Sequence, residues 1–353
     1  MMNAQGAGTK THRRGAVTSM KKRFALIAFF LMVAHSGILH SFELKPFNTR
    51  NQSPLVQIYG LPFPGEAQLT PPGSGDFHLV FDLANTCIVD SASREKITLD
   101  GETYRTTVVG RYGVARNFEM GVEIPYVAQG GGFLDAFIEN YHDAFGFSQG
   151  DRMQVSRNRL LFRYERDGTE RIRVDGSGSG LGDVRLTAGY QLYRNPSESP
   201  AAVALRAALK LPTGDADRLH GSGGTDLALW LTAGREYRTT GWGSWAVFGA
   251  AGVLGMSDGK VLEDQQRNLV EFGTIGIGWR PLDRFGLKAQ IDAHTPFYKD
   301  SDLVELGRSS AQLMIGGTFA ISEGTTIDIG IGEDIVIKAS PDVVFHLSVR
   351  SRF

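Results

Sequence analysis

Residues 343–353 read Val-Val-Phe-His-Leu-Ser-Val-Arg-Ser-Arg-Phe, and apolar and polar side chains alternate along most of this stretch. The apolar side chains fall on one face of an extended chain, namely Val343, Phe345, Leu347, Val349 and Phe353. The polar side chains fall on the other face, namely His346, Ser348, Arg350 and Arg352. Because successive side chains of a β-strand point to opposite sides, the segment predicts a strand with one apolar and one charged face.

The same alternation recurs upstream, in residues 117–127, 181–194, 200–212 and 284–295. Each stretch has about 9–13 residues, close to the ~9–11 that a tilted strand needs to cross a bilayer. A wholly apolar face beside a face that can hold charges in water is typical of a transmembrane strand. An open sheet edge in lipid would leave backbone groups unpaired, so the sheet must close. The sequence therefore predicts an all-β fold, a transmembrane antiparallel up-and-down β-barrel.

The segments of this kind give a predicted strand count of twelve: 76–90, 102–115, 117–127, 181–194, 200–212, 224–237, 243–255, 267–280, 284–295, 308–321, 324–337 and 342–353. Residues 157–166 and 169–175 predict a further hairpin, which would raise the count to fourteen if it entered the wall. We favour twelve because residues 169–175 are short for a wall strand. Short turns alternate with longer polar loops, so we expect the short turns to face the periplasm.

The composition excludes several other classes of protein. The 37 Lys and Arg residues nearly balance the 38 Asp and Glu residues, so no basic excess indicates nucleic acid as a partner. Glycine, with 44 residues, is well above its average share, as in many β-barrels. The single cysteine, Cys87, cannot form an intrachain disulfide.

The N-terminal region has the layout of an export signal. Basic residues 21–23 precede an apolar run over residues 24–34, which small residues close. This run is too short for a membrane-spanning helix, which needs about 20 residues. It predicts a cleaved signal peptide over residues 20–41, with cleavage after Ser36 or Ser41, behind an extension over residues 1–19. We therefore expect export to the outer membrane of a Gram-negative cell.

The C-terminal strand carries a second expected signal. The chain stops at Phe353, with apolar residues at alternate positions before it: Phe345, Leu347 and Val349. This pattern resembles the terminal strand signal that the bacterial barrel-insertion machinery reads. Ser351 stands where a bulkier aromatic residue is common. We expect this machinery and outer-membrane lipid as partners.

Residues 133–147 depart from the period of two and follow helical spacing. The apolar residues share one helical face: Phe133, Leu134, Phe137, Ile138, Tyr141 and Phe145. The segment predicts a short amphipathic helix inside the longest extracellular loop. One interpretation is a lid, or a helix that lies in the outer leaflet near an opening for apolar solutes. The other interpretation is a helix that only folds against the barrel rim.

Residues 42–75 form a proline-rich segment between the predicted signal peptide and the barrel, which spans 76–353. Six prolines make a regular element improbable over residues 46–75. The segment is interpreted either as a flexible periplasmic leader or as a plug that folds back into the lumen. We favour the plug because Phe47, Leu55, Tyr59, Leu61 and Phe63 require burial.

The inward faces of the predicted strands collect charges of both signs. They are Arg111, Glu119, Glu123, Arg185, Arg206, Lys210, Lys288 and Asp292. In a functional interpretation these lumen charges tune the selectivity of a pore. In a structural interpretation, which we favour, they form ion pairs across strands and fill a small barrel.

Catalytic and cofactor motifs are weak in this chain. His220 precedes Ser222 by two residues, as in some outer-membrane lipases, but the pair sits in a glycine-rich loop without an identifiable third group. The glycine-rich run over residues 176–183 precedes an alternating strand and no helix, so it is no nucleotide loop. The eight histidines show no metal-ligand spacing. We expect no enzyme, no cofactor and no metal.

Four stretches, residues 46–62, 111–126, 132–145 and 180–186, resemble an uncharacterised family of Gram-negative outer-membrane β-barrels, the domain of unknown function DUF3187. The second and fourth stretches are also similar to wider barrel families linked to solute uptake. The resemblance implies a fold and a location. It supplies no substrate and no catalytic residues.

The sequence leaves three functional hypotheses. The leading one is a passive channel for a small solute, with an apolar solute among the candidates. The second is a closed structural barrel whose loops bind a partner. The third is a lipid hydrolase that uses His220 and Ser222.

Overall fold

The structure is a computed structural model that describes residues 42–146, 151–197, 199–239, 241–336 and 338–353. The described residues belong to one compact unit that begins at Phe42. The predicted extension over residues 1–19 and the predicted signal peptide over residues 20–41 lie outside the described residues.

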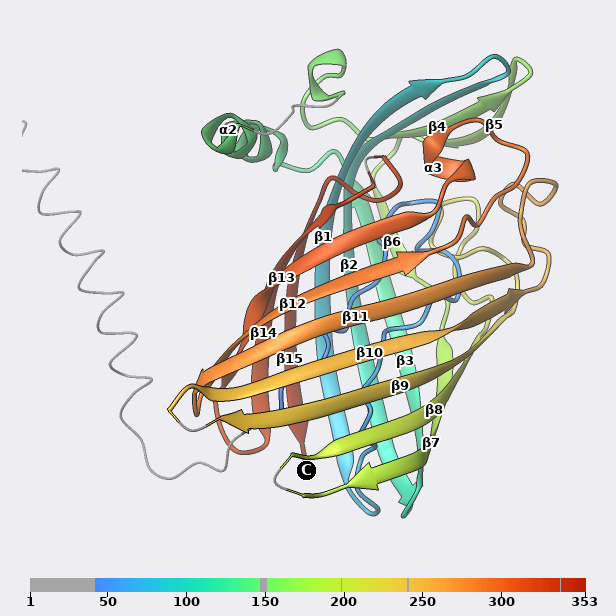
Figure 1. The fold of residues 1–353 in the computed structure, drawn as a ribbon. Helices are drawn as coiled ribbons and strands as arrows, with labels where there is room; N and C mark the ends of the chain where they lie inside the picture. Colours follow the sequence, from blue (N-terminus) through green and yellow to red (C-terminus); the bar gives the residue numbers. More distant parts are fainter. Residues whose placement is uncertain (1–41, 147–150, 198, 240, 337) are drawn as a thin grey trace, which may run out of the picture. The chain divides into compact units, whose positions relative to one another are not determined.

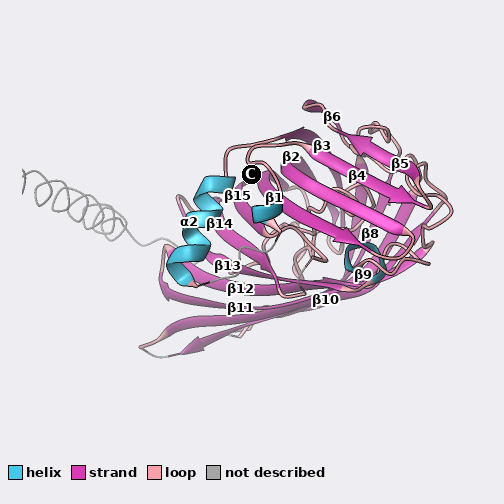
Figure 2. Ribbon diagram, turned by 90° about the horizontal axis from the view of Figure 1, so that it is seen from above, coloured by secondary structure: helices cyan, strands magenta, loops and turns pink. Residues whose placement is uncertain are grey.

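Twelve antiparallel strands close into a barrel (Figures 1 and 2). Each strand pairs with its neighbours in space, and β1 pairs with β15 to close the ring, with Leu83 opposite Phe345. The wall strands are β1 (Gly75–Ser91), β2 (Glu95–Ala115), β3 (Phe118–Gly130), β7 (Arg185–Asn195), β8 (Ala201–Lys210), β9 (Asp226–Thr239), β10 (Gly243–Met256), β11 (Leu269–Leu282), β12 (Phe285–His294), β13 (Ser310–Ala320), β14 (Thr325–Asp334) and β15 (Val343–Arg352). The predicted twelve-stranded barrel is confirmed.

Three further strands extend the sheet above the ring without entering it. The hairpin β4 (Leu161–Arg166) and β5 (Thr169–Val174) pairs with the upper end of β2, where Ile97 lies opposite Tyr164. The strand β6 (Gly178–Leu181) pairs with the upper end of β3. The fourteen-stranded alternative is therefore wrong, because this hairpin lies outside the closed ring.

Exposure alternates along the wall as expected for a barrel in lipid. On β3, the outward side chains of Met120 and Ile124 are 54% and 41% exposed, whereas the inward carboxylates Glu119 and Glu123 are 2% and 3% exposed. A soluble sandwich would bury the apolar face and expose the charges. Aromatic side chains gather near the short turns, where Trp245 stacks on Trp279 and Trp242 is exposed. Such a belt marks the interface between lipid and water.

The helices are short. They are α2 (Asp135–Phe145), α3 (Val304–Gly307) and the 3-10 turn η1 (Arg152–Gln154). Among the described residues, no helix is long and apolar enough to cross a membrane.

Candidate functional site inside the barrel

Residues 42–75, called the lumen segment below, enter the barrel and run through it as a U (Figure 1, blue). The first limb rises along β12 from the end that lies at the short turns. The Lys288 ammonium donates to the Lys45 carbonyl over 2.9 Å, and the Phe47 amide donates to Gln290 Oε1 over 2.8 Å. Higher up, Asn51 Nδ2 lies 2.9 Å from His294 Nε2. The limb thus follows successive inward positions of one strand.

The U turns at residues 53–59 and then descends on the opposite wall. The turn is closed by hydrogen bonds from the amides of residues 56 and 57 to the Ser53 carbonyl. The Gly60 amide then donates to Asp226 Oδ2 on β9 over 2.7 Å. Trp230 Nε1 donates to the Pro64 carbonyl over 2.8 Å, and the Thr70 amide donates to Glu119 Oε2 over 2.7 Å. Because the side chains of the wall satisfy its backbone, the lumen segment needs no regular secondary structure.

Above the turn, an apolar cluster fills the mouth on the side of the long loops; we call it the cap core. It joins the tip of the lumen segment to the β4–β5 hairpin and to the loops over residues 257–268 and 295–308. Tyr59 stacks on Phe297 at 4.9 Å, and the Tyr298 hydroxyl donates to the Leu55 carbonyl over 2.9 Å. Phe162 and Tyr164 are fully buried in the same cluster. In this state the mouth is closed by packed side chains.

Arg50 holds the two limbs of the lumen segment together. Its Nη1 donates to the carbonyl of Leu61 on the other limb over 2.8 Å, and its Nη2 donates to Glu123 Oε2 on β3 over 3.0 Å. Its guanidinium also lies 3.7 Å from the centre of the Phe63 ring. One side chain thus links both limbs and the wall.

The structure brings the predicted lumen charges inside the barrel, and seven of the eight form ion pairs. Arg206 pairs with Glu119 at 2.7 Å, and Lys210 pairs with Asp183 at 2.6 Å. The remaining pairs of this set are Arg185 with Glu123, Arg111 with Glu66, and Lys288 with Asp328. The eighth charge, Asp292, accepts hydrogen bonds from Thr274 and Gln290. Two of these pairs, Arg206 with Glu119 and Lys288 with Asp328, reach over one intervening strand, and Glu66 belongs to the lumen segment.

Glu66, Asp76 and His78 form the one cluster with metal-ligand spacing among the described residues; their ligand atoms lie within 4.8 Å of one another. Arg350 pairs with both carboxylates, and Lys45 pairs with Glu66. These cations already neutralise the carboxylates and would repel a metal ion. The cluster ties the lumen segment to β1 and β15.

His220 and Ser222 do not form a catalytic pair in this structure. The Ser222 hydroxyl accepts a hydrogen bond of 2.6 Å from Lys210, an ammonium that is itself held by two carboxylates. The His220 ring is buried beside Gly180, and burial lowers the pKa of His220. Both side chains stabilise the loop that follows β8.

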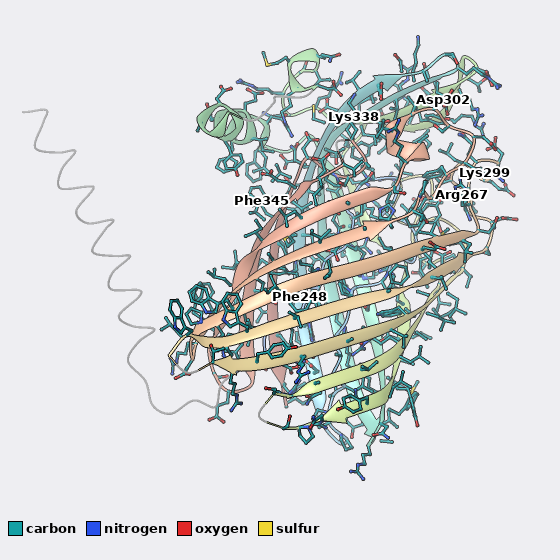
Figure 3. All side chains as sticks on the ribbon, viewed as in Figure 1. Phe248, Arg267, Lys299, Asp302, Lys338 and Phe345 are labelled. Atoms are coloured by element: carbon teal, nitrogen blue, oxygen red, sulfur yellow. The ribbon has the colours of Figure 1, made fainter. Side chains whose placement is uncertain are left out.

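The helix α2 packs on the outer face of the wall and not over the lumen. Leu134 and Ile138 are buried against the outward side chains of Leu83 and Val343. Phe137 lies 6.1 Å from Phe345, ring centre to ring centre, and Figure 3 labels Phe345 on this side of the barrel. Phe133 and Phe137 remain exposed at 65% and 53%, beside Tyr141, which is half-buried. The side chain of Phe145 lies outside the described part of α2.

The predicted C-terminal signal residues lie on the lipid side of β15. Leu347 and Val349 are 41% and 36% exposed, and Phe345 is partly covered by α2. Phe353 is 80% exposed, and its backbone exchanges two hydrogen bonds with Gly75. The terminal residue is thus held at the seam between the first and last strands.

A hollow lies on the outer surface of the wall. It is an apolar groove of about 610 Å³ over strands β8–β11, bordered by the outward side chains of Leu231, Val247 and Ile275. Small residues such as Gly249 and Ala233 form its floor. In a membrane this surface faces lipid chains, so the groove does not itself indicate a route through the barrel.

The rim on the side of the long loops contains acidic groups whose pKa is raised. Burial raises the pKa of Glu305 in α3 to about 7, and neither carboxylate oxygen has a hydrogen-bond partner outside its own residue. Burial also raises the pKa of Asp342 to about 7, although Arg152 donates to it over 2.8 Å. Lys338, labelled at the rim in Figure 3, pairs with Asp151 at 3.0 Å. The contacts of Asp342 and Lys338 join the segment around η1 to the connection between β14 and β15.

Sequence reasoning did not identify the polar contacts of the lumen segment. Arg50, Asn51 and Gln57 are buried at 3%, 2% and 2% exposure, yet a proline-rich stretch gives no periodic signal for their partners. Arg105 was also missed, although its position on the inward face of residues 102–115 could have revealed it.

The comparisons with known proteins agree with this geometry. Residues 24–353 match a family model described as a protein of unknown function, DUF3187. No curated protein matched the chain. The chain is similar to the crystal structure of the COG4313 outer membrane channel from Pseudomonas putida F1, with a TM-score of 0.51, 14% identity, and coverage of 82% of this chain and 99% of that one.

Two further solved structures match more loosely. The KdgM porin in complex with disordered oligogalacturonate matches with a TM-score of 0.39, 10% identity, and coverage of 79% of this chain and 99% of that one. The CymD monoaromatic hydrocarbon channel matches with a TM-score of 0.33, 13% identity, and coverage of 87% and 94%.

Proposed function

Since this chain belongs to the DUF3187 family and has the β-barrel fold of an outer-membrane channel, we propose that it is a gated channel for a small polar solute. The lumen segment is the gate, a plug rather than a flexible leader. In the state described here the gate is closed, and displacement of the lumen segment opens the route.

The observation that carries this proposal is the polarity of the interface between the lumen segment and the wall. Below the cap core, wall side chains bind the lumen segment chiefly through hydrogen bonds and ion pairs. Several buried polar atoms there have no protein partner, among them Gln52 Oε1 and Asp226 Oδ1. Buried polar groups in folded proteins are almost always satisfied, so we expect water or a solute to reach this interface. A hydrated interface can separate at lower cost than a dry core.

The same polarity favours a polar solute over an apolar one. The aromatic face of the loop helix suggested an apolar solute, but α2 lies on the outer wall and does not line the lumen. An apolar solute would have to desolvate the paired charges that line the lumen without replacing their hydrogen bonds. We therefore assign α2 to membrane contact in the outer leaflet.

Export and assembly complete the proposal. Residues 20–41 act as a cleaved signal peptide, and the barrel resides in the outer membrane. The residues Phe345, Leu347, Val349 and Phe353 are recognised by the barrel-insertion machinery. Replacement of Phe353 by Asp should reduce the amount of folded protein in outer-membrane fractions, and unchanged assembly would refute this role.

Conductance in planar bilayers tests the channel function. The full-length protein should show rare opening events, because the closed state is held by many contacts. A variant with a weakened gate, such as Arg50→Met, should open more often. If neither protein conducts ions or passes small sugars and anions in vesicles, the channel proposal fails.

A closed barrel that binds a partner is the second candidate, and the cap core favours it. A mouth filled by packed aromatic side chains is what a permanently closed barrel would need. Absence of conductance in every gate variant, together with a saturable extracellular partner, would replace the channel by this role. A lipid hydrolase has no support from the geometry of His220 and Ser222.

A further inference from the structure

Three arginines converge at mid-height in the lumen, just below the tip of the lumen segment. Arg50 comes from the lumen segment, Arg105 from β2 and Arg185 from β7, and each is at most 3% exposed. Arg185 lies directly opposite Glu123 in the register of β3 and β7, and Arg50 binds the same Glu123. Arg105 lies within electrostatic range of both other guanidinium groups. Three separate elements thus bring their positive charges to one place.

One carboxylate serves the ion pairs of this arginine cluster. Among the described residues, the three arginines form ion pairs with Glu123 alone, which lies 3.0 Å from Arg50 and 3.7 Å from Arg185. Arg105 has no ion pair there and binds only the backbone carbonyl and the side-chain oxygen of Gln57.

The other nearby acids are already engaged. Asp82 lies opposite Arg105 in the register of β1 and β2, but its oxygens contact Thr49, Gln52 and His346. Asp183 and Asp226 pair with Lys210. Within ion-pair distance, the three guanidinium groups therefore share one carboxylate, Glu123.

Unused hydrogen-bond donors concentrate at the same place. The buried atoms without a partner include Nε of all three arginines and Nη1 of Arg185. They also include the hydroxyl of Thr107, the next inward residue of β2, and the side-chain nitrogen of Gln57. A buried donor without an acceptor costs about 1–3 kcal/mol.

Not every buried arginine of the lumen has such a deficit. Arg206, another buried lumen arginine, uses all three of its guanidinium nitrogens on Glu119 and the Glu66 carbonyl. The barrel therefore can satisfy a buried guanidinium with its own groups, and it does not do so at Arg50, Arg105 and Arg185.

From this arrangement we infer that Arg50, Arg105 and Arg185, with Thr107 and Gln57, form a binding site for a small oxyanion such as phosphate, sulfate or a carboxylate. Planar guanidinium groups bind such anions through paired, charge-assisted hydrogen bonds. Because Arg50 and Gln57 belong to the gate and Arg105 and Arg185 to the wall, the anion bridges the two. If the proposed channel function holds, the bound anion is also the solute that passes through the lumen, and only this statement rests on the proposed function. Binding of the anion does not depend on conduction.

The test uses inorganic phosphate and the full-length protein in detergent micelles. The urea midpoint of unfolding is followed at pH 7.5 as phosphate replaces chloride at constant ionic strength. We expect a saturable rise of the midpoint, because a ligand that binds only the folded state stabilises it. Arg105→Gln should weaken the apparent phosphate affinity about tenfold or more, since it removes charge-assisted hydrogen bonds. Arg206→Gln should lower the midpoint without phosphate but keep the response to phosphate.

Thr107→Val provides a second variant that is nearly isosteric. It removes a buried hydroxyl without a partner, so the protein without phosphate should be at least as stable as the wild type. Its apparent affinity for phosphate should nevertheless fall. This variant keeps the inference testable if Arg105→Gln does not assemble.

Two results would overturn the inference. One is a wild-type protein whose midpoint shows no saturable response to phosphate or sulfate. The other is a response of the same size in Arg105→Gln and Thr107→Val, which would mean that water alone fills the arginine cluster. A phosphate response without any conductance would support the site and refute the channel. Conductance without a phosphate response would support the channel and refute the anion site.

Discussion

Replacement of Arg50 by Met should open the gate. Met keeps most of the apolar stem and removes the guanidinium, which binds Leu61 at 2.8 Å and Glu123 at 3.0 Å and lies 3.7 Å from the Phe63 ring. Breaking one partner of a buried ion pair costs about 3–5 kcal/mol. Arg50 makes these contacts only while the lumen segment is docked, so the cost falls on the closed state. Since about 1.4 kcal/mol is tenfold, the ratio of open to closed channels should rise at least about a hundredfold.

Single-channel recording in planar bilayers measures this ratio as the open probability. The matched control is Arg94→Met, which removes an exposed arginine whose partner Asp167 lies on the outer hairpin. Exposed ion pairs contribute about 0–1 kcal/mol, so this variant should change the open probability less than about fivefold. If Arg50→Met folds and keeps the open probability of the wild type, the lumen segment is not the gate.

Three further perturbations test other parts of the account. Burial raises the pKa of Glu305 to about 7, so the folded protein binds more protons than the unfolded chain between about pH 5 and 7. The free energy of unfolding therefore falls as the pH rises through this range. Glu305→Gln should remove up to about 3 kcal/mol of this pH dependence, measured as the urea midpoint at pH 5.5 and pH 8. Ile138→Ala should weaken the docking of α2 on the wall by about 2–4 kcal/mol, because Ile138 is fully buried against the outer wall. Limited proteolysis should therefore cut the Ile138→Ala protein within residues 133–146 faster than it cuts the Phe133→Ala protein. Equal cutting of the two would mean that the helix does not dock as described. Ile275 is 68% exposed on the lipid face. Ile275→Lys should therefore lower the folding stability in vesicles by about 2–4 kcal/mol, whereas Ile275→Leu should change it little. Equal folding stability of the two variants would contradict the assignment of that face to lipid.

The wall of the barrel was accessible from sequence because lipid and water impose opposite demands on neighbouring side chains. Met120 and Ile124 are exposed while Glu119 and Glu123 are buried, and this contrast follows from alternation alone. Alternation cannot show where a strand continues above the membrane. For that reason β2 begins at Glu95, earlier than the predicted start at residue 102, since its upper end pairs with β4.

The interior could be anticipated only in part. The apolar residues of the lumen segment indicated burial, and Phe47 and Tyr59 are indeed 0% and 1% exposed. Their partners come from distant strands: Gln290 binds the backbone of Phe47 across 243 positions of sequence. A proline-rich segment has no period that would specify such contacts. The arginine cluster is hidden for the same reason, because its three members belong to three separate elements.

A reversible disulfide across the gate tests the central claim most directly. A Cβ built on Gly278 would lie 3.3 Å from Cβ of Leu44, close to the ~3.5–4.5 Å found in disulfides. Leu44→Cys with Gly278→Cys, in a Cys87→Ser background, would fix the free end of the lumen segment to β11, while its other end is fixed by β1. The account predicts that oxidation abolishes channel opening, that reduction restores it, and that either single cysteine variant opens normally under both conditions. Equal opening of the oxidised and reduced double-cysteine protein would contradict it.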